Sequence, residues 1–173
     1  FNGANVESVN QMFLNCKALK RVDLSNFNAE NLVSMAEMFS DCTALESVNL
    51  SNFNGVKASY LDFMFANCSA LKEINFFNFN AGNVSSMTQI FKQCSSLLKL
   101  DLSTFKTASV LDMSKMFFNC QSLTEIKFGN FATTSVKTME GMFHNCSALE
   151  NLNLSSFNTS NVTSMKEMFF NCS

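Results

Sequence analysis

The chain has 173 residues, of which 47% are hydrophobic and 15% are charged, and its formal net charge is −2. A chain of this length can bury a substantial core, and its charges form no block of one sign, which argues against nucleic acid and anionic membranes as partners. No apolar run approaches the ~20 residues of a membrane span, and the opening residues show no signal peptide.

The composition indicates a short unit that has been copied many times. The chain contains 20 Phe, 11 Met and 7 Cys, but no Pro and no Trp. The cysteines recur every 26 residues from Cys16 to Cys172, with no insertion or deletion. A constant period of this length is typical of solenoid proteins. We therefore interpret residues 1–173 as a single array of about six to seven 26-residue repeats, which begins and ends inside repeats and is a fragment of a longer solenoid.

Aligning the repeats on cysteine places similar apolar residues in columns. One column consists of phenylalanine alone: Phe13, Phe39, Phe65, Phe91, Phe117, Phe143 and Phe169. A second phenylalanine column is Phe1, Phe27, Phe53, Phe79, Phe105, Phe131 and Phe157. A third, which we call the inner column, is Leu24, Leu50, Phe76, Leu102, Phe128 and Leu154. Stacked repeats bury such columns against one another, whereas a single repeat cannot bury its own apolar stripe.

Each repeat is predicted to contain a short helix before its cysteine. Within residues 34–45, the apolar side chains recur at intervals of three and four, as on one face of a helix. Capping boxes mark several starts, namely Ser8 with Gln11, Ser34 with Glu37, Ser86 with Gln89 and Ser164 with Glu167. Tyr60 occupies the capping position of the third repeat and cannot cap, so that helix start is the exception.

A strand is predicted after each cysteine, because the apolar period changes to two. Residues 22–24 and residues 152–154 alternate apolar and polar side chains, as a half-buried strand does. Polar stretches such as residues 158–161 then lead to the next repeat. The expected fold is an α/β solenoid with a parallel β-sheet on one face and short helices on the other.

The repeat resembles a known family. The stretches 147–160 and 161–172 are similar to the unit of the BspA-like leucine-rich-repeat proteins, which are bacterial surface proteins and lipoproteins with 26-residue repeats. Ala58, Tyr60 and Phe63 depart from the usual unit. The resemblance covers the whole chain and implies an extracellular, cell-surface protein that adheres to host proteins, matrix proteins or other cells. It supplies no catalytic residues.

The seven cysteines invite three interpretations. Their even spacing on one apolar column favours buried free thiols that act as small apolar side chains. Neighbouring repeats also bring cysteines near each other, so a disulfide remains an alternative, and a metal site is a third. The spacing differs from the close Cys pairs of most metal sites, so no metal and no cofactor are expected.

No catalytic set is expected. His144 is the single histidine and falls in a column that accepts many residue types, which indicates a position at the solvent edge. No serine or cysteine pairs with it in a recognisable nucleophile arrangement. Carboxylates are scattered over different columns, and the 5 glycines form no phosphate-binding loop. The sequence therefore favours a protein without enzymatic activity.

Partner binding is expected on the exposed columns of the sheet, because the buried columns specify the fold. These exposed columns are polar and of mixed charge, which suits a protein or glycan partner. The candidate residues are Phe77, Glu73, Lys99, Asp101, Glu125 and Lys127. Phe77 is the clearest, since it replaces serine in its column; the alternatives are that its ring folds back beside Phe76 and Phe79, or that the residue arose by drift and has no role.

Two features bear on location and assembly. Asn158 and Asn161 are the best glycosylation candidates among many Asn-x-Ser/Thr sequons, if the source is a eukaryote. Phe118 and Phe170 could mark a lateral packing surface or only cover the helix edge. The leading hypothesis is a binding or adhesion array at the cell surface. A structural spacer or filament that self-associates through its ends or edges is the alternative, and an intracellular scaffold is a third class.

Overall fold

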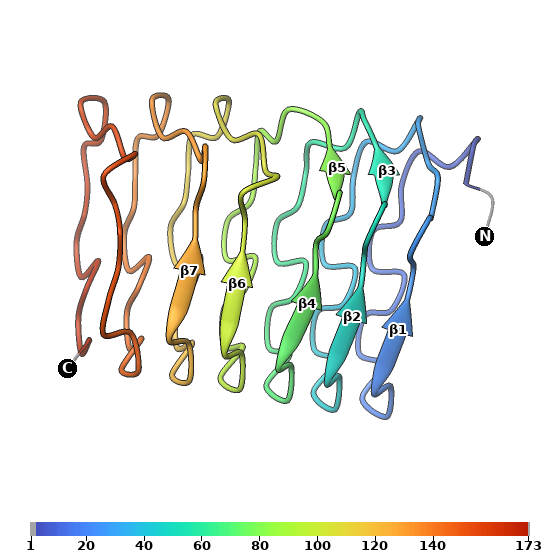
Figure 1. Cartoon of the computed structure of the whole chain (residues 1–173), viewed down its shortest axis with the longest axis horizontal. Helices are drawn as coiled ribbons and strands as arrows, with labels where there is room; N and C mark the ends of the chain where they lie inside the picture. Colours follow the sequence, from blue (N-terminus) through green and yellow to red (C-terminus); the bar gives the residue numbers. More distant parts are fainter. Residues whose placement is uncertain (1–2, 173) are drawn as a thin grey trace.

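The computed structural model describes residues 3–172, which form one stack of parallel rungs (Figure 1). Its strands are two or three residues long: β1 (Arg21–Asp23), β2 (Ser47–Asn49), β3 (Asn54–Gly55), β4 (Glu73–Asn75), β5 (Asn80–Ala81), β6 (Lys99–Asp101) and β7 (Glu125–Lys127). Every strand pair is parallel. The parallel sheet face predicted from the period-two pattern is therefore confirmed.

The register between strands equals the repeat length. Val22 lies opposite Val48, and Val48 lies opposite Ile74, so β1, β2 and β4 form one three-stranded sheet. Strands β6 and β7 pair separately, and β3 pairs with β5 further along the rungs. Because each step is one repeat, residues of one column lie side by side.

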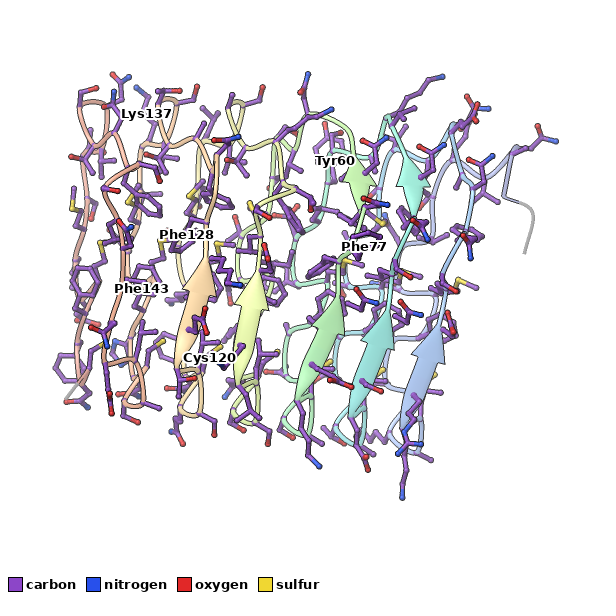
Figure 2. All side chains as sticks on the ribbon, in the orientation of Figure 1. Tyr60, Phe77, Cys120, Phe128, Lys137 and Phe143 are labelled. Carbon is purple, nitrogen blue, oxygen red and sulfur yellow. The ribbon has the colours of Figure 1, made fainter. Side chains whose placement is uncertain are left out.

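The core consists of the apolar columns. In the first phenylalanine column, successive rings stack nearly parallel, with ring centroids 5.2 Å apart for Phe13 and Phe39 and 5.7 Å apart for Phe91 and Phe117. Phe143 continues this stack at 5.4 Å from Phe117 (Figure 2). Each ring buries a large apolar area and is fully covered by its neighbours from Phe39 to Phe143. Phe1 of the second column lies outside the described residues.

The cysteines are all free, and those from Cys42 to Cys146 are buried. The thiol of Cys120 (Figure 2) donates to the carbonyl oxygen of Phe91 in the preceding rung, with a distance of 3.1 Å from Sγ to oxygen. Cys94 and Cys146 repeat this bond at the same distance. Burial raises the pKa of Cys146 to about 12 and holds the pKa of Cys120 well above its ordinary value. The thiols are thus protonated core groups, as the free-thiol interpretation predicted.

The predicted helices are wrong: the described residues contain none. Residues 35–45 instead form successive turns with two alternating kinds of hydrogen bond. Alternate amides donate to the next rung at 2.9 Å, and these belong to Glu37, Phe39 and Asp41. The amides between them donate to the carbonyl three residues earlier at 3.0–3.3 Å, and these belong to Met38, Ser40 and Cys42. Bonds between rungs therefore replace the bonds of a helix.

Left-handed backbone conformations explain why no helix forms. Glu37 and Asp41 have φ angles of 55° and 60°, in the left-handed region. The same holds in every repeat for the residue before cysteine, which is usually asparagine, the residue type that tolerates this region best. Gln11, Gln89 and Glu167 also lie in the left-handed region, at 56–58°. The predicted capping boxes are therefore wrong, since the Gln or Glu residue of each box has a left-handed backbone and cannot belong to a helix.

The predicted strand at residues 152–154 is also absent. Where two rungs pair, the backbone amide of the inner-column residue donates to a carbonyl oxygen of the next strand. Leu24 donates to Asn49 and Leu102 donates to Lys127, each at 2.8 Å. The larger Phe76 and Phe128 make no such bond within residues 3–172. Their rings instead pack edge-on against the next rung, 5.1 Å from Phe105 and 4.9 Å from Phe157.

We call the places after Phe76 and Phe128 the split junctions. The first separates β4 from β6, and Figure 1 shows β6 standing further from β4 than β2 does. The second separates β7 from residues 151–153. A phenylalanine in the inner column is thus associated with an interrupted sheet.

Candidate binding surface

The exposed columns of the strands form a shallow surface, which we call the strand face. Strand side chains alternate, so Val22, Val48 and Ile74 point inward and their neighbours point to solvent. A groove of about 720 Å³ follows β1, β2 and β4. Its polar lining includes Arg21, Glu73 and Asn75. The predicted residue Glu73 therefore lies in a groove, together with Arg21 and Asn75, which the sequence interpretation did not select.

Four other predicted residues lie together. Lys99, Asp101, Glu125 and Lys127 line a second groove of about 280 Å³ across β6 and β7. Lys99 Nζ lies 3.0 Å from Glu125 Oε2, and this hydrogen bond and charge lower the pKa of Glu125. Both side chains are largely exposed, so the pair adds little stability. Its main effect is to neutralise two of the four charges.

Phe77 lies at the end of β4, beside a third groove of about 410 Å³ that also includes Asp101 (Figure 2). Its side chain is 66% exposed. The alternative that its ring folds back beside Phe76 and Phe79 is therefore wrong: those two side chains are buried and contact each other. The structure thus brings the six predicted residues onto one surface, spread over three adjoining grooves.

His144 lies elsewhere and differs from its prediction. Its side chain is only 13% exposed, and its ring is stacked between Phe118 and Phe170, with centroids 4.4 Å and 4.7 Å away. The solvent-edge assignment is therefore wrong, because aromatic neighbours in the same column cover the ring. His144 Nδ1 lies 3.7 Å from Glu167 and makes no hydrogen bond to any described residue.

Metal and membrane features were sought in the same part of the chain. Within residues 3–172, no group of three or more His, Cys, Asp or Glu side chains is arranged to hold a metal ion. The same residues include no helix with the length and apolar character needed to cross a membrane.

The glycosylation candidates are both exposed. The side-chain amide nitrogen of Asn161 donates a hydrogen bond to the carbonyl of Thr134 at 2.8 Å. Asn158 uses its side-chain oxygen, which accepts from the amide of Ser160 at 3.0 Å. Because an N-linked glycan joins the amide nitrogen, Asn158 is the better placed of the two. Glycosylation at either position stays a prediction.

Comparison with solved structures places this fold among leucine-rich-repeat proteins. A T. pallidum leucine-rich-repeat protein, TpLRR, is 19% identical, with a TM-score of 0.51; the match covers 82% of this chain and 70% of that one. A leucine-rich-repeat protein from Eubacterium ventriosum is 16% identical, with a TM-score of 0.49 over 88% of this chain, and the chain spans 42% of that protein's length. No curated protein matches.

The family comparison covers the whole array. The family described as "Mycoplasma protein of unknown function, DUF285" matches residues 1–100 and again residues 85–173. Together with the TpLRR structure, this match confirms the resemblance to the repeats of bacterial leucine-rich-repeat proteins. The fold is a leucine-rich-repeat-type array with parallel strands, and the chain belongs to the DUF285 family.

Proposed function

We propose that the chain is a non-enzymatic binding array at the cell surface, which holds a protein or glycan partner on its strand face. The observation that supports this most is the series of adjoining grooves along β1, β2, β4, β6 and β7. Their lining combines amides, carboxylates and cations, with Phe77 as an exposed aromatic anchor. Such a surface suits many modest polar contacts around one aromatic side chain.

The strand face is a better candidate than the turn side of the array. On the turn side, formed by residues 35–45 and their equivalents, alternate backbone amides are bonded between rungs, and side chains such as Met38, Phe39 and Cys42 belong to the core. On the strand face, the outward side chains vary from rung to rung without disturbing the buried columns, and they include the exposed ring of Phe77. Partner choice can therefore change there without changing the fold.

The test of binding uses a charge reversal on the strand face. Purified wild-type array and a Glu73→Lys variant are titrated against a panel of immobilised host and extracellular-matrix proteins and glycans. We expect the variant to lose ~5-fold or more in affinity for the partner that the wild type binds. Glu7→Lys, at an exposed position outside the three grooves, is the control. Equal affinities of all three proteins would place binding off the strand face.

The surface location has its own test. Intact source cells are treated with a protease that does not enter them, and the array is then detected with an antibody. Loss of the array while a cytoplasmic marker survives is the expected result. An array that survives until the cells are lysed would contradict the surface proposal and favour an intracellular scaffold.

Lateral self-association is the alternative function, and one observation favours it. Tyr60, Val33 and Val56 are 40–47% exposed, and the amide of Tyr60 lies 3.4 Å from the carbonyl oxygen of Val33 in the preceding rung. They lie outside the three grooves. Tyr60→Ser restores the residue found in four other repeats. If this surface drives assembly, sedimentation will show wild-type oligomers that the variant lacks.

A further inference from the structure

A groove lies at the first split junction, between β4 and β6. Phe76 is buried and packs edge-on against Phe105, 5.1 Å between ring centroids, where β4 and β6 are not paired. The groove of about 410 Å³ at this junction is lined on the β4 side by Phe77 and on the β6 side by Asp101. An aromatic ring and a carboxylate therefore line the same groove from opposite sides.

Phe77 presents its ring from a fixed backbone. Its amide donates to Asn75 Oδ1 at 3.0 Å, and its carbonyl accepts from the amide of Asn52 at 2.8 Å. The fold does not need the ring, since serine occupies the same column at Ser25, Ser51, Ser103 and Ser155. A largely exposed ring on a rigid backbone offers a π face to a ligand at little cost in entropy.

Asp101 carries an ionised carboxylate with one oxygen available. Its Oδ1 accepts from the amide and the hydroxyl of Ser103, at 3.0 Å and 2.6 Å. These hydrogen bonds lower the pKa of Asp101, so the group is charged at neutral pH. Its Oδ2 accepts no hydrogen bond from any described residue, and Lys127, whose charge also lowers this pKa, makes no ion pair with it among residues 3–172.

We propose that this groove binds an arginine side chain of a partner protein, with the guanidinium over the ring of Phe77 and hydrogen-bonded to Oδ2 of Asp101. A guanidinium is planar, stacks on aromatic faces and forms directed bonds to carboxylates, whereas the ammonium of lysine is a compact charge that gains less from the ring. A neutral sugar would use the ring but not the charge of Asp101.

The second split junction is a natural comparison within the same chain. There Gly129 replaces Phe77, and Asn153 replaces Asp101. That junction has the interrupted sheet but neither the ring nor the carboxylate, so it is not expected to bind arginine. The inference rests on the proposed function, since it names one contact by which the strand face would hold a protein partner.

The probe is a short capped peptide, acetyl-Gly-Arg-Gly-amide, titrated into the isotope-labelled array and followed by NMR. Peptides with lysine or glutamine in place of arginine serve as comparisons. We expect arginine to bind ~5-fold more tightly than glutamine, with lysine between them, and with shifts confined to residues near 75–78 and 101–104. The affinity should fall as salt is added.

Two substitutions restore residues that other repeats already carry. Phe77→Ser introduces the usual serine, and Asp101→Asn introduces the residue found at Asn49, where Oδ1 accepts from the amide of Ser51 in the same way. Each should weaken binding of the arginine peptide ~5-fold. Asp23→Asn is the matched control, because Asp23 is bonded to Ser25 in the same manner but the groove that it lines includes no aromatic residue. It should leave the affinity unchanged.

The outcomes separate this inference from the proposed function. Arginine binding that survives both Phe77→Ser and Asp101→Asn overturns the arginine site. So does a neutral disaccharide that binds in a Phe77-dependent manner where the arginine peptide does not. If Glu73→Lys reduces partner binding while Phe77→Ser and Asp101→Asn do not, the strand face binds its partner and only the arginine site fails. If no partner binds the strand face, the peptide titration still decides whether the groove recognises arginine.

Discussion

Residues 21–75 and residues 99–154 follow the same 26-residue plan but form different sheets. In the first region, three strands pair continuously, and Leu24 and Leu50 occupy the inner column between them. In the second region, Leu102 is followed by one paired strand, and Phe128 is followed by none. The comparison teaches that one inner side chain influences whether neighbouring rungs pair, while the stacked core continues through both regions.

The regions also differ in how their rungs join beyond the strands. Near β3 and β5, small residues such as Ala29 and Gly55 let the backbones bond directly, as Ala29 does to Asn54 at 2.9 Å. In the second region, threonine occupies this column. The Thr133 hydroxyl donates to the carbonyl of Asn158 at 2.9 Å and accepts from its amide at 2.7 Å. A side chain there takes over a connection that the backbone makes elsewhere.

The largest expected effect concerns the cysteine column, which is common to both regions. The folded pKa of Cys146 is raised to about 12, above the ordinary value of 9.0, so the unfolded thiol loses its proton first. The stability that this thiol contributes is fully present below pH ~9 and is lost between pH ~9 and 12, by ~1.4 kcal/mol per pH unit or ~4 kcal/mol in total. Urea unfolding from pH 8 to 11 measures this slope, which should be smaller in Cys146→Ala. An unchanged slope would show that this thiol ionises in the folded array.

The next largest effect on stability is expected at Gly82, which lies close to the backbone of Val56 in the preceding rung. A Cβ at this position would lie 2.4 Å from the carbonyl oxygen of Val56. Gly82→Ala should therefore lower the free energy of unfolding by ~3 kcal/mol, since backbone must move to relieve the overlap. Gly141→Ala is a comparison with space for the Cβ, where only the left-handed backbone, with φ of 57°, opposes alanine and ~1 kcal/mol is expected. Equal losses would mean that the close approach at Gly82 has no cost of its own.

Thr133→Val tests the side-chain connection of the second region. The substitution keeps the shape but leaves the amide and carbonyl of Asn158 without their partner, so a loss of ~2 kcal/mol is expected. Thr134→Val is the control, because the neighbouring threonine is exposed and its hydroxyl makes no hydrogen bond to the described residues. Chemical denaturation of both variants measures the difference. An equally large loss of stability in Thr134→Val would show that the hydroxyl of Thr133 makes no specific contribution.

Phe128→Leu addresses the split junction directly and has the smallest expected effect on stability. Leucine is the usual residue of the inner column, so residue 128 should gain the bond to the next rung that Leu102 makes to Lys127. The lost aromatic packing offsets this gain, and stability should change by less than ~1 kcal/mol. Hydrogen exchange is the sharper measurement, with ~10-fold slower exchange expected at the amide of residue 128. The converse variant, Leu102→Phe, should speed exchange at the amide of residue 102. Unchanged exchange in both variants would show that the inner column does not influence strand pairing.

Much of this fold was predictable because the sequence shows the columns directly. The repeat length, the parallel strands, the two phenylalanine stacks and the buried free cysteines all follow from residues that recur at one position. The period alone could not distinguish a helix from a run of turns, since the spacing of Met35, Met38 and Phe39 suits both. Asparagine before cysteine was the available signal, because a recurring residue suited to the left-handed region does not belong in the middle of a helix.

The candidate surface was predictable only in part. The exposed columns named the six residues, and the structure places them on one face. Their division into three grooves was not predictable. It depends on how neighbouring rungs pack and pair, which the columns of the sequence do not show. His144 was misplaced for a similar reason: Phe118 and Phe170 cover it from the neighbouring rungs, and a single column of letters does not show such stacking.

The turns before each cysteine have one further consequence. Their alternate amides, such as those of Glu37, Phe39 and Asp41, all donate toward the next rung, so their peptide groups point the same way along the array. Each peptide carries a dipole of ~3.5 D, and aligned dipoles add. These turns therefore contribute an electrical polarity that grows with each repeat, with its positive pole toward higher residue numbers. An α-helix has the opposite sense, since its positive pole lies at its N-terminal end.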